Sequence, residues 1–182
     1  MGGDPSRLTV IGASIAVNAG SWVYSLPSSL GGKVALYQEA QGGSTIATHA
    51  DPTKDLEHQV IAAANDNASR IIIALGTNDD NAGNMTTLQA TYEAGIVALK
   101  ASNPNATIYA MNVLKRWSDN TTGGEVDKAN IRTAVAAACT AQSITCWDTY
   151  TSSWIAQDET LDGVHPNPAG NAAILVEALA RL

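Results

Sequence analysis

The stretch RIIIALG (70–76) is an uninterrupted apolar segment built on three isoleucines and closed by a glycine. Polar and apolar residues do not alternate in it, which is typical of a strand that other elements cover on both faces. Working outward from it, four more apolar segments are predicted as strands: LTVIG (8–12), KVALYQ (33–38), ATIYAMNVL (106–114) and SITCW (143–147).

Helical segments are predicted between these strands, at 51–66, 85–103, 124–141 and 167–182, with a partly helical region at 16–30 that Pro27 interrupts. Asp51 and Pro52 are residue types that begin helices. Regular alternation of strands and helices predicts an α/β fold, with three layers in the order α/β/α around a five-stranded parallel sheet. Because no linker or repeat interrupts the pattern, we expect one domain over residues 1–182.

The composition indicates a folded, weakly charged protein: 45% of the 182 residues are hydrophobic and only 15% are charged. A net charge of -7 without any basic run argues against a nucleic-acid partner. No apolar stretch reaches the roughly 20 residues of a membrane span. The beginning does not have the pattern of a signal peptide. We expect a secreted or extracytoplasmic protein whose leader is absent from this sequence, with a cytoplasmic location as the alternative.

The cysteines and histidines do not form a recognised metal motif. Cys139 and Cys146 are either two buried free thiols or a local disulfide, and the sequence leaves both open. His49 and His58 lack metal-ligand spacing and are expected on the surface. We therefore expect no metal and no organic cofactor.

Functional side chains in parallel sheets gather beyond the carboxyl ends of the strands. We therefore expect chemistry just after residues 12, 38, 75, 114 and 148. Four segments carry suitable residues: Gly12-Ala13-Ser14, Gly42-Gly43-Ser44, Gly76-Thr77-Asn78-Asp79 and LDGVHPNPAG (161–170). A dinucleotide site is disfavoured, because the residues after Gly12 lack the later glycines of G-x-G-x-x-G and Glu39 alone is weak evidence for one.

A nucleophilic hydrolase fits these segments better. A serine needs an adjacent base, a group that orients the base, and donors for the developing oxyanion. Asp162 and His165 are three residues apart, a spacing that one helical turn would place on a single face, with the carboxylate holding the imidazole's tautomer. Asn78 can donate from its side-chain amide, and Gly43 and Ser14 from their backbone N–H groups.

The four segments resemble, in order and in wording, the SGNH hydrolases, also called GDSL esterases and lipases. That family has a Ser in a G-D-S context near the N-terminus, a Gly after the second strand, an Asn in G-x-N-D, and D-x-x-H near the C-terminus. LGTNDDN (75–81) and LDGVHPNPAG (161–170) match the last two blocks closely. The resemblance spans the chain from the first predicted strand to the last predicted helix, and implies a flavodoxin-like strand order.

Carried over to this sequence, the resemblance implies Ser14 as nucleophile, His165 as general base and Asp162 as the residue that orients it. The oxyanion hole would consist of Gly43, Asn78 and the amide of Ser14. The chain departs from the family at Ala13, where Asp usually precedes the serine. An Asp can bond local backbone N–H groups and an Ala cannot, so this change bears on how firmly the nucleophile loop is held.

The expected reaction is hydrolysis of short-chain acyl esters, with acetyl groups on a carbohydrate or simple alcohol preferred, through an acyl-enzyme. An acyltransferase, or a lysophospholipase or thioesterase, on the same scaffold is the nearest alternative, and a binding module without catalysis is the alternative that Ala13 supports. Trp117 and Trp154, in loops expected to border the site, would either contact substrate or anchor the loops to the core. The sequence does not indicate an oligomeric state.

Overall fold

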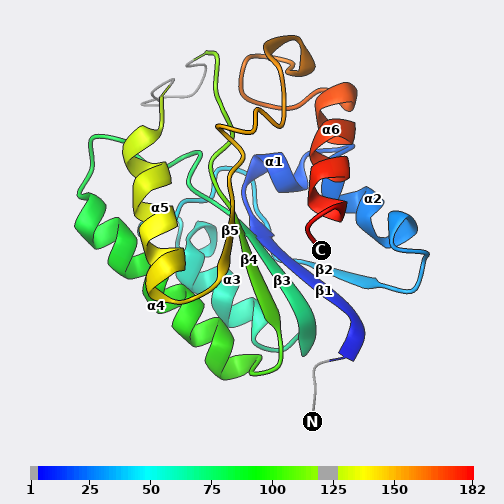
Figure 1. Ribbon diagram of the computed structural model, residues 1–182. Helices are drawn as coiled ribbons and strands as arrows, with labels where there is room; N and C mark the ends of the chain where they lie inside the picture. Colours follow the sequence, from blue (N-terminus) through cyan, green and yellow to red (C-terminus); the bar gives the residue numbers. More distant parts are fainter. Residues whose placement is uncertain (1–3, 119–126) are drawn as a thin grey trace.

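The computed structural model describes residues 4–118 and 127–182 (Figure 1). Its centre is a five-stranded sheet in the order β2-β1-β3-β4-β5, in which every neighbouring pair is parallel. The strands are β1 (Asp4–Gly12), β2 (Ala35–Gln38), β3 (Ala68–Ala74), β4 (Thr107–Met111) and β5 (Thr145–Trp147). The predicted α/β class, the parallel sheet and its flavodoxin-like order are confirmed.

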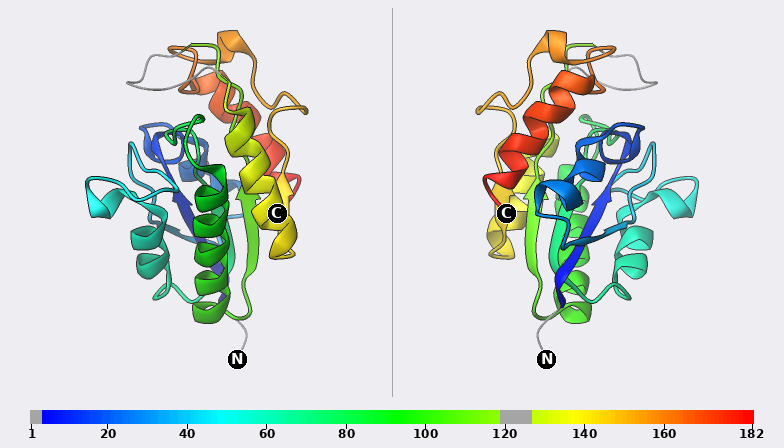
Figure 2. Two further views of the ribbon diagram at one scale, coloured as in Figure 1. Left: turned by 90° about the vertical axis from the view of Figure 1, so that its left-hand side faces the viewer. Right: turned by 90° about the vertical axis from the view of Figure 1, so that its right-hand side faces the viewer.

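Helices cover both faces of the sheet, as Figures 1 and 2 show. They are α1 (Ser14–Val17), α2 (Trp22–Ser29), α3 (Leu56–Ala63), α4 (Met85–Ser102), α5 (Ala129–Ala141) and α6 (Pro168–Leu179), with 3₁₀ turns η1 (Pro52–Lys54) and η2 (Gln157–Glu159). The helices α3, α4 and α5 pack on one face, and α1, α2 and α6 on the other. In the described parts of the chain, every helix falls short of a membrane span in length or in hydropathy.

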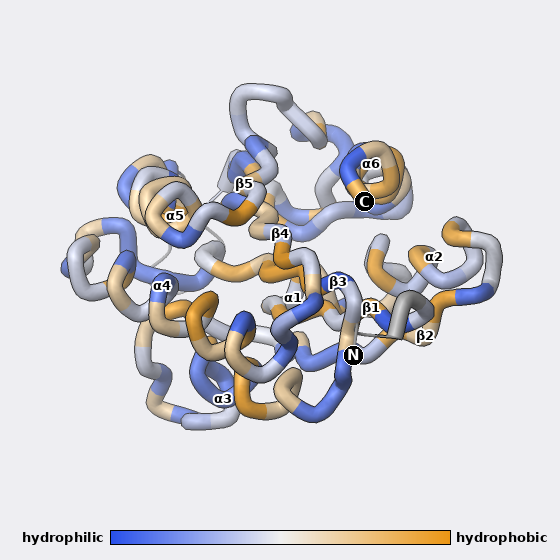
Figure 3. The backbone as a smooth tube through the Cα atoms, turned by 60° about the horizontal axis from the view of Figure 1, so that its bottom comes forward, coloured by the Kyte–Doolittle hydropathy of each residue, from blue (hydrophilic) through white to orange (hydrophobic). Residues whose placement is uncertain are grey.

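Consecutive isoleucines of β3 serve the two layers alternately, because neighbouring side chains of a strand point to opposite faces. Ile71 and Ile73 belong to the core beneath α3, α4 and α5, while Ile72 belongs to the core beneath α2 and α6. All three are completely buried. Figure 3 shows hydrophobic segments on the central strands and on parts of the helices that surround them. A continuous apolar run is therefore what a strand between two layers requires.

Two helix predictions need correction. Pro27 lies inside α2 rather than interrupting it. The predicted helix at 51–66 is two elements: Asp51 caps η1, and Asp55, whose carboxylate accepts from His58 N at 3.0 Å, begins α3 separately. Each has its own side-chain cap, so the chain turns between them.

Both cysteines are free thiols, and they lie next to each other, Cys139 on α5 and Cys146 on β5. A hydrogen bond with the Cys146 thiol, together with burial, raises the pKa of Cys139. Of the two readings that the sequence left open, the structure has the thiol form.

Candidate active site

A serine near the start of the chain and a histidine near its end meet at the carboxyl edge of the sheet. Ser14 is the first residue of α1, directly after β1, and His165 precedes α6. Ser14 Oγ lies 3.0 Å from His165 Nε2, and His165 Nδ1 lies 2.7 Å from Asp162 Oδ2. With the ring proton on Nδ1, Nε2 can accept the serine proton, which is the arrangement a nucleophilic serine needs.

Asp162 and His165 are paired by a loop, not by the helical turn that their spacing suggested. The loop is closed by a bridge between Thr160 and Pro166, and Asp162 Oδ1 accepts from the N–H groups of Val164 (2.9 Å) and His165 (2.8 Å). Burial alone would raise the pKa of Asp162, but these N–H donors and the imidazole outweigh it and hold that pKa well below its usual range. The carboxylate of Asp162 is therefore charged at neutral pH.

Gly163 gives this loop its shape. Its φ of +83° lies in the left-handed region, and a Cβ there would collide with the side chain and backbone of Ser118. Any other residue would be strained as well as crowded. The loop that carries Asp162 and His165 is thereby packed directly against the loop that follows β4.

Gln59 supplies the support that Ala13 cannot. Ala13 is buried and makes no side-chain cap to α1. The amide of Gln59, completely buried on α3, instead pairs with the peptide before the nucleophile: Oε1 accepts from Gly12 N at 2.8 Å, and Nε2 donates to Gly12 O at 3.1 Å. The same Nε2 donates to Ser44 Oγ at 2.8 Å. One side chain thus joins the nucleophile turn to the loop after β2.

Sequence reasoning missed Gln59, although a signal was present. Leu56, Gln59, Val60 and Ala63 form the buried stripe of α3, with the spacing of a helix face. A glutamine within such a stripe must find hydrogen-bond partners, because an unpaired buried amide is costly.

The proposed oxyanion donors face one another across two loops. Asn78 Nδ2 donates to Ser44 O at 3.0 Å, so the side chain points at the segment that carries Gly43. An amide has two N–H donors, and this bond occupies one of them. Gly43 has a φ of +85°, in the left-handed region, and a Cβ there would have open space around it. The structure brings these residues together, and their donor roles are part of the proposal below.

Asp79 fixes the distance between the same two loops. Its carboxylate accepts from Ile46 N, at 2.8 and 3.0 Å, and from Ala47 N at 2.9 Å. The buried ammonium of Lys128 donates to Asp79 O at 2.7 Å. Burial raises the pKa of Asp79, while the N–H bonds and the charge of Lys128 act in the opposite direction. The residue after Asn78 is therefore a clamp for the loop of Gly43, a role that the sequence left unassigned.

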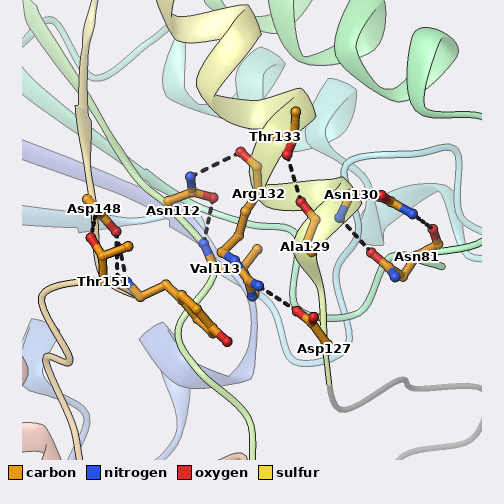
Figure 4. A network of polar contacts seen from close by, with 11 residues as sticks. Asn81, Asn112, Val113, Asp127, Ala129, Asn130, Arg132, Thr133, Asp148 and Thr151 are labelled. Carbon is orange, nitrogen blue, oxygen red and sulfur yellow. Dashed lines mark hydrogen bonds and ion pairs between the residues drawn. The ribbon is translucent and has the colours of Figure 1, made fainter.

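Polar contacts also hold the loops beyond β3 and β4, as Figure 4 shows. Asn112, just after β4, accepts from Val113 N at 2.8 Å and donates to Arg132 O at 3.1 Å. The strand β4 therefore ends at Met111, whereas the sequence predicted a strand as far as residue 114. Asn130 donates to Asn81 through both its backbone and its side chain, each at 3.0 Å. The start of α5 thus anchors the loop that carries Asn78, one of the proposed oxyanion donors.

The two tryptophans proposed to contact substrate differ in position. Trp117 is half-buried beside the loop that carries Asp162 and His165, and its backbone N–H donates to Gly163 O at 2.8 Å. Trp154 is only 3% exposed and its ring packs on Trp147, with centroids 5.8 Å apart. Of the two roles that the sequence left open for Trp154, this burial fits an anchor of its loop to the core better than a contact with substrate.

Comparisons with known proteins identify the family and the fold. Residues 10–173 match the GDSL-like lipase/acylhydrolase family. A search of curated protein sequences gives no match. The fold is similar to that of a protein from Lactobacillus plantarum, with a TM-score of 0.81, 20% identity, and coverage of 98% of this chain and 97% of that one.

Two esterases share the fold as well. The M. smegmatis aryl esterase has a TM-score of 0.80 at 16% identity, over 97% of both chains. An acetyl xylan esterase has a TM-score of 0.72 at 16% identity, over 97% of this chain and 99% of its own. Since the family match covers nearly the whole chain, and the fold agrees, the protein belongs to the GDSL-like lipase/acylhydrolase family, the SGNH hydrolases, and is a carboxylic ester hydrolase.

Proposed function

We propose that the protein hydrolyses short-chain acyl esters, acetyl esters foremost, through an acyl-enzyme formed on Ser14. The observation that carries this proposal is the unbroken chain of contacts from Ser14 through His165 to Asp162, at 3.0 and 2.7 Å. A hydroxyl, an imidazole and a carboxylate bonded in this order support the proposal, because acyl transfer by a serine requires such an arrangement.

In the proposed first step, Ser14 Oγ attacks the ester carbonyl carbon and its proton passes to His165 Nε2. Negative charge collects on the carbonyl oxygen, where the N–H groups of Ser14 and Gly43 and the amide of Asn78 would donate to it. The C–O bond to the alcohol then breaks, and the alcohol oxygen takes the proton from Nε2. Water repeats these steps on the acyl-enzyme, releasing the acid and restoring the serine.

The preference for acetyl esters is supported by a solved structure of the same fold: an acetyl xylan esterase aligns over 97% of this chain with a TM-score of 0.72.

The test uses p-nitrophenyl acetate, butyrate and octanoate with the wild type and Ser14→Ala. We expect kcat/KM to fall with acyl length and Ser14→Ala to abolish turnover while its circular dichroism spectrum stays that of the wild type. A serine-directed phosphonate should add one adduct, located at Ser14 by mass spectrometry. Turnover of acetate by Ser14→Ala at the wild-type rate would overturn the assignment, and octanoate preferred over acetate would overturn the acyl size.

A further inference from the structure

A groove of about 430 Å³ runs between α2 and α6, and Pro166, the residue after His165, is part of its lining. A smaller cavity of about 40 Å³ touches Ser14 and His165 directly. The two spaces share four lining residues, Ala19, Leu161, Pro166 and Asn171, so the groove is continuous with the site. In Figure 1, α1, α2 and α6 lie together on one side of the sheet, and α2 contacts α6.

The groove is uncharged and largely apolar. None of the described residues that line it carries a charge. Trp22 and Leu175 form part of its walls. Leu161, which also lines the cavity at the catalytic histidine, is 73% exposed. An exposed leucine beside a catalytic group offers apolar surface that a ligand can cover.

The two amide side chains in the groove already have partners. Asn171 Oδ1 accepts from Trp22 N at 3.0 Å, and its Nδ2 donates to Pro166 O at 3.1 Å. Asn167 Oδ1 accepts from the first N–H groups of α6, and its Nδ2 donates to Asp158 O at 2.8 Å. These amides hold the walls in place, so they offer few hydrogen bonds to a ligand with many hydroxyl groups.

The chemistry of the reaction indicates which half of the ester lies in the groove. His165 Nε2 must return its proton to the alcohol oxygen, so the alcohol half of the ester has to extend past His165. Pro166, the residue after His165, and Leu161, the residue before Asp162, line both the groove and the cavity at the catalytic pair. The proposed oxyanion donors Gly43 and Asn78 do not line it. The alcohol, rather than the acyl group, therefore points into the groove.

We infer that this groove binds the alcohol half of the substrate and favours uncharged, apolar alcohols with an aromatic or alkyl group over polyhydroxylated ones. The inference rests on the proposed function and adds the class of alcohol to it. A space of about 430 Å³ lies within the usual range of small-molecule sites and holds a benzene ring with room to spare. Beyond the hydroxyl of Ser25, these walls offer few side-chain partners to the hydroxyl groups of a sugar.

The experiment keeps the acetyl group constant and varies the alcohol, using methyl acetate, benzyl acetate and glycerol monoacetate. Ala172→Trp fills the groove from an exposed position on α6, and Leu161→Ser removes its most exposed apolar side chain. Val176→Trp is the matched control, because Val176 is 64% exposed on the same helix and does not line the groove.

We expect the wild type to prefer benzyl acetate to glycerol monoacetate in kcat/KM. Each groove variant should lower the ratio of benzyl to methyl acetate roughly tenfold, the scale on which apolar pockets discriminate. Val176→Trp should leave that ratio unchanged. Deacylation, measured in single turnovers, should be the same for every acetate, because all three form one acetyl-enzyme.

Three results would overturn the inference while leaving the proposed function intact. Equal losses for methyl and benzyl acetate would show that the groove does not hold the alcohol. A changed dependence on acyl length in the groove variants would make it an acyl site. A changed molecular mass in light scattering with unchanged alcohol selectivity would mean that a second copy of the chain occupies it. Failure of the proposed function is separate: the wild type would then turn over none of the acetates.

Discussion

Replacing Gln59 with methionine removes the hydrogen bonds that hold the nucleophile turn while keeping an unbranched side chain of similar length. In the native structure this amide bonds both polar groups of Gly12, at 2.8 and 3.1 Å, and Ser44 Oγ at 2.8 Å. Gly12 lies two residues before Ser14. We expect Gln59→Met to lower both stability and turnover.

The magnitude follows from which groups lose their partner. Gly12 O retains its bond from Gln41 N at 3.0 Å, so it stays satisfied. Gly12 N loses the acceptor it has in Gln59, and a buried donor without an acceptor costs about 1–3 kcal/mol. Adding a modest loss at the Ser44 hydroxyl, we expect the free energy of unfolding to fall by about 2–4 kcal/mol. Displacing the nucleophile by up to about 1 Å lowers kcat by about 10- to 100-fold.

The assay measures kcat and KM for p-nitrophenyl acetate together with urea unfolding of the same samples. Asn103→Leu is the matched control. Asn103 is also a buried amide that bonds backbone groups, Ala68 N at 3.2 Å and Ala63 O at 3.4 Å, but it lies where β3 begins, at the opposite end of the strand from the site. We expect both variants to lose stability and only Gln59→Met to lose kcat, with KM little changed.

Gln59→Glu tests the hydrogen-bond direction separately. A carboxylate accepts from Gly12 N but cannot donate to Gly12 O, and burial raises its pKa above the unfolded value of about 4.3. Its stability penalty should therefore be small below that value and grow as pH rises. The reasoning is refuted if folded Gln59→Met keeps a kcat within about threefold of Asn103→Leu, since a displaced nucleophile must cost more than that.

Three other variants probe the site and its frame. Asp162→Asn should be destabilised at pH 7 relative to the wild type, and the difference in melting temperature should shrink below about pH 4: a depressed folded pKa gives stability above the unfolded pKa that is lost as pH falls. An equal difference at pH 7 and pH 3 would contradict this. Asn78→Ala should lower kcat by about 10²–10³-fold, as loss of one oxyanion donor does elsewhere; a loss confined to KM argues against the donor role. Trp154→Ala should cost about 3–5 kcal/mol of stability on urea unfolding while KM for acetate esters stays constant. An altered KM with unchanged stability would return Trp154 to the substrate site.

The parts of this fold that were predictable are those that depend on local pattern. Three consecutive isoleucines, Ile71 to Ile73, identify a strand buried on both faces, and the boundary of α4 at Ser102 follows from the proline two residues later. Asp162 and His165 were predicted as a pair from their spacing. The spacing indicated a helical turn, however, whereas the pair is built by a loop in which the carboxylate collects nearby N–H groups.

The parts that were not predictable depend on contacts between distant segments. Nothing local distinguishes Trp117 from Trp154, because both follow strands. Packing against Trp147 and the guanidinium of Arg181 covers the ring of Trp154. The clamp made by Asp79 joins residues 33 positions apart. Such contacts depend on how the strands and helices are arranged in space, and no local pattern in the sequence indicates them.

Ala13 shows why a departure from a motif is weak evidence against function. A triad needs geometry, and the residue before the serine contributes to it only by holding the turn. Here Gln59, on a helix and 47 residues away from Gly12 in the chain, bonds the turn from the side of the core. The same amide reaches Ser44, so the nucleophile turn and the Gly43 loop share one support.

The packing around Ala13 disfavours an aspartate at this position when Gln59 is unchanged. The alanine is 2% exposed and packed in the core, so a carboxylate placed there would have to be desolvated. The N–H group of Gly12 already has its acceptor in Gln59 and would not be free to compensate that cost. Ala13 and Gln59 therefore fit one another. Ala13→Asp without a change at Gln59 should lower the stability of the turn that carries Ser14.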